Sequence, residues 1–216
     1  MTGKEAKVMS NVIPVNLEDT NEVRLAGKIE KPLEFSHKTN SESFFKTSII
    51  IKRLSGVCDV IPLVIPNKIV DNMIRIEKGM FVELAGRFQS RKEGGKVKSF
   101  VFCQEMWKVS EETYKNRCSV CGSLYLTPKF HTTGKGVGVT YMSVIAARKF
   151  NRADFLPCIC WNGIAEFARN LPEKTRVCGK GRLQSRQGTK NDAPHTFYEI
   201  SLSGLMKIED AKKKGA

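Results

Sequence analysis

Long hydrophobic runs are missing from this sequence. No stretch of 18 or more apolar residues occurs, so we expect no helix that crosses a membrane. The segment from Met1 to Thr20 carries charge and lacks an apolar core of signal-peptide length. Acidic residues are also scarce, with 22 Asp and Glu against 36 Lys and Arg, which gives a net charge of +14. Such an excess of positive charge favours a polyanionic partner, either nucleic acid or an anionic membrane surface.

Recognisable catalytic and cofactor motifs are missing as well. The three histidines, His37, His131 and His195, show no H-E-x-x-H or comparable ligand spacing. The sequence contains no nucleophile elbow, and its acidic residues are not clustered as a metal-dependent nuclease requires. The segment Gly134–Gly138 lacks the G-x-x-x-x-G-K-[ST] arrangement of a phosphate-binding loop and is more typical of a hairpin. We therefore predict a binding protein that is not an enzyme and uses no cofactor.

An internal repeat with a constant offset of 95 residues decides the architecture. Gly86–Arg91 and Gly181–Arg186 differ in only one place, where Phe88 corresponds to Leu183. The same offset relates further identical pairs: Gly27 and Gly122, Phe35 and Phe130, Arg53 and Arg148, Asp59 and Asp154, Pro62 and Pro157. This period is too long for a solenoid and indicates a duplicated domain. We predict domains at 20–108 and 115–208, a linker at 109–114, a flexible segment at 1–19 and a basic tail at 209–216.

The order of expected elements within each copy indicates an all-β fold with one helix per domain. Each copy opens with alternating apolar residues, as in Val23, Leu25, Gly27 and Ile29, which is typical of a half-buried strand. Two further β-rich runs follow, then a helical stripe, then two more strands. The residues of the two stripes are Ile69, Met73 and Ile76, and Ile164, Phe167, Ala168 and Leu171. Three strands, a helix and two strands make up a five-stranded OB barrel, so we predict two tandem five-stranded OB-fold barrels.

The seven cysteines argue against a closed disulfide framework, because their number is odd. The simplest expectation is free thiols in a reducing cytosol. Cys118, Cys121, Cys158 and Cys160 could be considered as a zinc site. Their counterparts at the 95-residue offset are all aliphatic: Val23, Ala26, Leu63 and Ile65. We therefore interpret the four cysteines as small buried hydrophobic residues and predict no metal.

An ordered set of motifs in the second copy resembles the bacterial and phage-type single-stranded DNA-binding protein family. The motifs extend over about 85 residues, and the first copy resembles a diverged version of the same domain. They are Thr132-Thr133-Gly134, Ala147-Arg148-Lys149-Phe150, Asp154-Phe155-Leu156-Pro157, Trp161, Ala165-Glu166-Phe167-Ala168 and Gly181–Arg186.

The resemblance implies three base-stacking residues in the second copy: Phe150, Phe155 and Trp161. Aromatic faces accept any base, while a basic groove follows the phosphate backbone. The surrounding cations assigned to this groove are Arg148, Lys149, Arg152, Arg182 and Arg186.

The first copy departs from this pattern. It has Ser55, Val60 and Pro66 at the three aromatic positions, so it is expected to stack bases poorly. It retains cations and adds one aromatic residue at candidate DNA-binding positions: Arg53, Arg87, Arg91 and Phe88.

The resemblance implies sequence-independent binding and protection of single-stranded DNA during replication, recombination or repair. Two alternatives stay open: a primosome or replisome interaction module with weak DNA contact, and a single-stranded RNA binder. The family generally works with four OB domains together, so two per chain imply a homodimer. Replication proteins are further candidate partners, and the expected location is the cytoplasm, at the nucleoid. The family usually ends in an acidic tip that recruits enzymes, whereas Asp210–Ala216 is basic, so we do not assume such recruitment.

Overall fold

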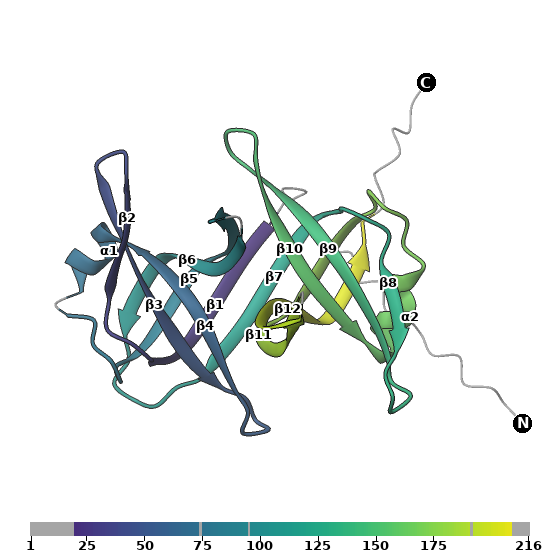
Figure 1. Cartoon of the computed structure of the whole chain (residues 1–216), viewed down its shortest axis with the longest axis horizontal. Coiled ribbons are helices and arrows are strands. Elements are labelled where there is room, and N and C mark those ends of the chain that lie inside the picture. The colour runs from purple at the N-terminus through teal and green to yellow at the C-terminus, as the bar shows by residue number, and fades with distance from the viewer. Residues whose placement is uncertain (1–19, 74, 95, 191, 209–216) are drawn as a thin grey trace, which may run out of the picture.

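The computed structural model describes residues 20–73, 75–94, 96–190 and 192–208 (Figure 1). The predicted flexible segment 1–19 and the predicted basic tail 209–216 lie outside these residues. Within the described part of the chain, neither helix is long and apolar enough to cross a membrane.

Both copies of the repeat form the same series of elements. The first contains β1 (Thr20–Ile29), β2 (Glu34–Thr39), β3 (Glu42–Lys52), β4 (Cys58–Pro66), α1 (Asn67–Asn72), β5 (Phe81–Glu93) and β6 (Lys96–Lys108). The second contains β7 (Lys115–Leu124), β8 (Lys129–Thr132), β9 (Gly138–Arg148), β10 (Arg152–Trp161), α2 (Asn162–Arg169), β11 (Arg176–Lys190) and β12 (Ala193–Lys207). The bounds of β1 and β7 differ by the repeat offset of 95 at both ends. We call the two series the first half and the second half.

Each half closes into a barrel, which confirms the predicted fold class of two tandem OB-fold barrels. In the first half β1 pairs with both β3 and β5, and β4 pairs with β3. A short parallel pairing of β4 with β6, at Leu63↔Val101, completes the ring. The second half repeats this closure between β10 and β12 at Cys158↔Ile200. The short strands β2 and β8, which we did not predict, pair only with β3 and β9 and form the two ends of the sheet. The exact domain boundaries stay a prediction.

The helices are shorter than the apolar stripes predicted. α1 ends at Asn72, so Met73 and Ile76 follow the helix, although Ile76 is still buried. In α2 the buried residues are Ala165 and Ala168, whereas Phe167 is exposed. Six and eight residues make less than three turns. A helix this short covers its barrel with few side chains. Residues after each helix, such as Ile76 and Leu171, are also buried and complete the cover.

An antiparallel pairing of β1 with β7 joins the two barrels into one 12-stranded sheet (Figure 1). The pairing runs from Thr20↔Cys121 to Ala26↔Lys115. At its centre Val23 faces Cys118, its own counterpart in the repeat. A residue that faces its own counterpart across antiparallel strands marks a local twofold axis. The two halves therefore meet as the two subunits of a symmetric dimer would.

Two asparagine side chains extend the strand pairing at this seam. The Asn21 amide donates to Phe88 O at 2.7 Å and accepts from Phe88 N at 3.1 Å. Its counterpart Asn116 makes the same pair of bonds with Leu183 O and N, at 2.6 and 2.8 Å. Each amide therefore satisfies a backbone donor and acceptor where β5 and β11 lead into their hairpins.

The cysteines follow the prediction only in part. Cys121 and Cys178 lie directly opposite each other on β7 and β11 and form a disulfide, so the expectation of free thiols is wrong for this pair. The register of the two strands brings the two residues together, and nothing in their sequence spacing showed this. Cys118, Cys158 and Cys160 are buried and free, as the aliphatic counterparts predicted. Burial raises the pKa of the Cys118 and Cys160 thiols to about 12, so these thiols stay protonated.

Close approach of strands explains one repeated glycine. A Cβ atom on Gly122 would lie 2.1 Å from Ile145 O, and one on its counterpart Gly27 would lie 2.2 Å from Ile50 O. Both contacts are with backbone, which cannot move aside without opening the barrel. β1 and β7 therefore need a residue without a side chain where they turn from one neighbour to the next.

We predict that Gly122→Ala destabilises the protein by roughly 1–3 kcal/mol or more, because the new methyl group overpacks the barrel wall. Thermal unfolding followed by circular dichroism measures the effect. Gly134→Ala is the matched control, since its Cβ would meet no atom within 4 Å. Equal melting temperatures for the two variants would show that the barrel tolerates a side chain at the crossing.

Candidate nucleic-acid interface

The outward face of the β9–β10 pair presents two of the three predicted stacking residues. β9 and β10 pair from Arg152↔Arg148 to Trp161↔Val139. Along β10 the alternate residues Asp154, Leu156 and Cys158 are buried. Phe155 is on the other side, 46% exposed, and Trp161 is 36% exposed at the end of the strand, just before α2. Alternation thus places the Phe155 ring at the surface, and Trp161 is exposed where the strand ends, after the buried Ile159 and Cys160.

Phe150 is displayed by the turn between these strands. Its φ is 63° and that of Asn151 is 53°, both in the left-handed region that residues other than glycine rarely adopt. Its ring is 90% exposed. A strained backbone that holds a large apolar ring in water costs stability, and such costs are typical of functional positions. The structure therefore places all three predicted aromatic residues on one hairpin, in contact with solvent.

Tyr125 is a fourth aromatic residue of this surface that the sequence analysis missed. It lies directly after β7, is 50% exposed and packs edge-to-face on Phe155 with ring centroids 5.2 Å apart. Its counterpart in the first half is Glu30, so the repeat did not single it out. The signal available was an aromatic residue followed by Leu126 where a strand ends and polar residues are expected. We call Phe150, Phe155, Trp161 and Tyr125 the aromatic platform.

Three of the predicted DNA-binding arginines are ion-paired with buried carboxylates, and two of them, Arg53 and Arg148, are counterparts in the repeat. Arg148 Nε lies 3.1 Å from Asp154 Oδ1, and Arg53 Nε donates to Asp59 Oδ2 at 2.7 Å. Burial raises the pKa of the Asp154 carboxyl, while the hydrogen bond from Asn21 and the charges of Arg148 and Arg87 oppose this rise. These two arginines compensate buried charges, which a merely solvated cation would not do.

Each of these carboxylates also reaches the other half. Asn21 Nδ2 donates to Asp154 Oδ2 at 2.8 Å, and Ser185 N donates to Asp59 Oδ1 at 2.7 Å. The β9–β10 hairpin is thereby fixed to β1 of the first half, and the β3–β4 hairpin to β11 of the second. Arg53 and Arg148 consequently support the contact between halves.

The remaining predicted cations lie in three settings. Lys149, Arg152 and Arg182 are exposed. Arg186 lies over the Phe197 ring at 4.7 Å and 3.4 Å from Glu199 Oε1. Arg87 is half-buried near Asp154, and Arg91 lies 5.8 Å from the Phe100 ring centroid. Lys149 and Arg152 flank Phe150 in the same turn, so these two cations are closest in the chain to an aromatic ring of the platform.

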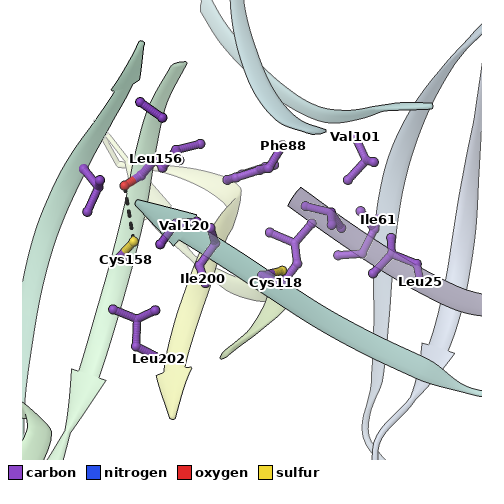
Figure 2. Close-up of a cluster of buried hydrophobic side chains, with 14 of the residues drawn as sticks. Leu25, Ile61, Phe88, Val101, Cys118, Val120, Leu156, Cys158, Ile200 and Leu202 are labelled. Carbon is purple, nitrogen blue, oxygen red and sulfur yellow. Dashed lines mark hydrogen bonds between the residues drawn. The ribbon is translucent and has the colours of Figure 1, made fainter. Parts of the chain in front are cut away.

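The prediction that Phe88 contacts DNA is corrected by the structure. Phe88 is 1% exposed, and Figure 2 shows it among buried side chains from both halves. It belongs to the inward-facing set of β5 with Val82 and Leu84, and its counterpart Leu183 is fully buried. Both halves therefore have a core residue at this position, and Phe88 fills more volume there than Leu183 does.

No protein-family model matches the chain. Single-stranded DNA-binding protein 3 of Listeria innocua is 28% identical over 108 residues, which cover 47% of this chain and 68% of the relative. The single-stranded DNA-binding protein of Halalkalibacterium halodurans is 28% identical over 102 residues, or 44% and 61% of the two chains. The match thus spans about two thirds of the length of these relatives.

Solved structures show the same fold over nearly the whole chain. The wild-type single-stranded DNA-binding protein from Thermus aquaticus aligns with a TM-score of 0.77 and 17% identity, covering 92% of this chain and 98% of that one. A deletion mutant of the same protein gives 0.76 and 18%, covering 92% and 99%. At this identity the likeness establishes the fold alone.

We predict that Arg148→Gln lowers stability by roughly 1–3 kcal/mol, because the buried Asp154 carboxylate loses its ion pair and keeps only the Asn21 hydrogen bond and the charge of Arg87. Lys149→Gln, one residue away and exposed, is the matched control and should leave the melting temperature within about a degree or two of wild type. If both variants melt with wild type, Arg148 is an ordinary surface cation and the ion pair contributes nothing measurable.

Proposed function

We propose that this chain, which belongs to the single-stranded DNA-binding protein family in its two-domain form, binds single-stranded DNA without sequence preference. It would thereby protect exposed strands during replication, recombination or repair. The observation that carries the proposal is the aromatic platform, in which three exposed rings of the β9–β10 hairpin are joined by Tyr125 and the turn of Phe150 also carries Lys149 and Arg152. Members of this family bind DNA and are not enzymes.

The physics of the platform fits this ligand. Every base has a π-face, so stacking on an aromatic ring contributes ~1–3 kcal/mol per base whatever the sequence. A duplex keeps its bases stacked on each other and offers none of these faces. The net charge of +14 adds attraction to phosphates, which depends on salt and not on sequence. Selectivity for single strands then comes from the rings, and long-range attraction from the lysines and arginines.

We also propose that the two halves have different roles in binding. We assign the first domain to 20–108 and the second to 115–208, with the platform confined to the second. A homodimer would bring four OB domains together and cover exposed edges such as β2 and β8, which end the 12-stranded sheet. Its mass would be twice the 24.2 kDa of one chain. This function also places the protein with DNA in the cytoplasm, in contact with replication proteins.

Titration with fluorescently labelled oligonucleotides tests the function directly. We predict that single-stranded DNA binds much more tightly than duplex of equal length, with log K falling against log[salt] by ~0.7 per neutralised phosphate. Equal affinity for single-stranded RNA would favour the RNA-binding alternative. Negligible affinity for all three polymers would contradict the proposal and favour an interaction module of the primosome or replisome.

Truncation of platform residues tests the site. We predict that Phe150→Ala weakens binding of single-stranded DNA roughly 5- to 150-fold, the loss expected for one stacked base. Its stability should be unchanged, since an exposed ring leaves no cavity and alanine, like phenylalanine, keeps a Cβ atom in the left-handed turn. Ser55→Ala, at the equivalent position of the first half, is the control and should bind like wild type. Undiminished affinity of Phe150→Ala would remove this ring from the site.

A further inference from the structure

One side-chain hydrogen bond links the first half to the hairpin that carries the aromatic platform. Asn21 Nδ2 of β1 donates to Asp154 Oδ2 of β10 at 2.8 Å, and its second N–H group donates to Phe88 O at 2.7 Å. Asn21 and Asp154 are both buried. A hydrogen bond to an ionised carboxylate is stronger than one between neutral groups, and here no water can replace the donor.

The other half does not repeat this bond at the twofold-related place. Asn116, the counterpart of Asn21, makes the same two backbone bonds with Leu183, but within the described residues it does not bond to Asp59. Asp59 instead accepts from Ser185 N and Oγ, at 2.7 and 3.3 Å. Arg53 adds two more hydrogen bonds to the same carboxylate, from Nε and Nη2. The two buried carboxylates are therefore held in different ways.

The Asp154 carboxylate has the weaker hold on its arginine. Arg148 Nε lies 3.1 Å from Asp154 Oδ1, but this buried nitrogen has no hydrogen-bond partner among the described residues. Burial raises the pKa of the Asp154 carboxyl, and the Asn21 hydrogen bond opposes that rise. Asn21 thus favours the ionised carboxylate that attracts Arg148.

Arg148 lies at the base of the turn that displays the platform ring. It is the last residue of β9 and pairs with Arg152, the first residue of β10. Like charges directly opposite each other on antiparallel strands destabilise the pairing. Asp154 is two residues beyond Arg152 on the same face of the strand, so its carboxylate draws the Arg148 guanidinium away from Arg152. The first half has Val57 at the position of Arg152 and contains no such pair of cations.

The turn itself has an unfavourable backbone that its surroundings must maintain. Phe150 and Asn151 have φ values of 63° and 53°, in the left-handed region. Residues other than glycine stay there only where neighbouring groups hold them. The first half has Gly56 in place of Asn151, with a φ of 83°, and glycine adopts this conformation freely. The contacts at the base of the hairpin therefore matter more in the second half.

We propose that Asn21 is a positioning residue for the aromatic platform: by fixing Asp154 it keeps Arg148 away from Arg152 and holds the turn that presents Phe150. This inference rests on the proposed function and extends it to the first half. The first half then affects the affinity for single-stranded DNA through a buried hydrogen bond that the DNA does not touch.

Affinities for a 35-nucleotide oligothymidylate, measured for single and double variants, test the inference. Asn21→Ala should weaken binding several-fold, up to the roughly 5- to 150-fold expected for one lost stacked base. In a Phe150→Ala background the same substitution should change the affinity by less than about twofold, because the ring through which it acts is gone. Asn116→Ala loses the same two backbone bonds and no bond to a carboxylate, so this matched control should bind like wild type.

Hydrogen exchange of the free proteins gives a readout that needs no DNA. Asn21→Ala should speed amide exchange in the segment 146–154, because the base of the hairpin opens more often, whereas Asn116→Ala should not. If Asn21→Ala does not fold, Asp154→Asn takes its place in both measurements. This variant keeps the shape of the side chain and an acceptor for Asn21, but it removes the charge that draws Arg148.

Two results would overturn the inference and leave the proposed function standing. One is wild-type affinity of the folded Asn21→Ala protein. The other is an equal loss of affinity with and without the Phe150 ring, which would show that Asn21 acts on the fold in general. Wild-type protein that binds no single-stranded DNA would instead defeat the proposed function itself, and unchanged exchange in Asn21→Ala would still refute its hold on the turn.

Discussion

The antiparallel pairing of β1 with β7 is the constraint on which the rest of the structure depends. Because Val23 faces Cys118, its own counterpart, the two barrels are related by a local twofold axis within one chain. This arrangement places the β3–β4 and β9–β10 hairpins against the other half, where Asp59 accepts a hydrogen bond from Ser185 of β11 and Asp154 accepts one from Asn21 of β1. Tying two copies in one chain raises their effective concentration, so the contact forms at any dilution of the protein.

Duplication within one chain also frees the two halves to diverge. In a homodimer both subunits would have to carry the same residues, whereas here the two barrels share their cores and differ at the surface. The platform residues Phe150 and Phe155 correspond to Ser55 and Val60 at the repeat offset. The last hairpin of each half also differs, since β11–β12 is four residues longer than β5–β6. The buried positions differ mainly in volume, as Phe88 and Leu183 do. The two barrels therefore resemble each other more closely in their cores than at their surfaces.

The barrels could be predicted from the sequence because their determinants are local or repeated. Alternation along β1, the shared Gly27 and Gly122, and the aliphatic counterparts of Cys118 and Cys158 each follow from one-dimensional patterns. The disulfide of Cys121 with Cys178 could not be predicted, since it depends on the register of two strands far apart in the chain. The sequence did not identify Tyr125 as a site residue, because it contacts Phe155 only in the folded sheet. Arg148 and Arg53 were assigned to phosphates because the sequence shows a cation but not the buried carboxylate beneath it.

The central claim is that the second half binds single-stranded DNA through exposed aromatic rings, and Trp161 allows it to be measured in solution. The chain has two tryptophans, so a Trp107→Phe protein reports on Trp161 alone. Saturating oligothymidylate should quench most of its emission, because a stacked base lies on the indole, while duplex DNA at the same concentration should not. Unchanged emission at saturation, with binding established by the anisotropy of labelled DNA, would contradict the account.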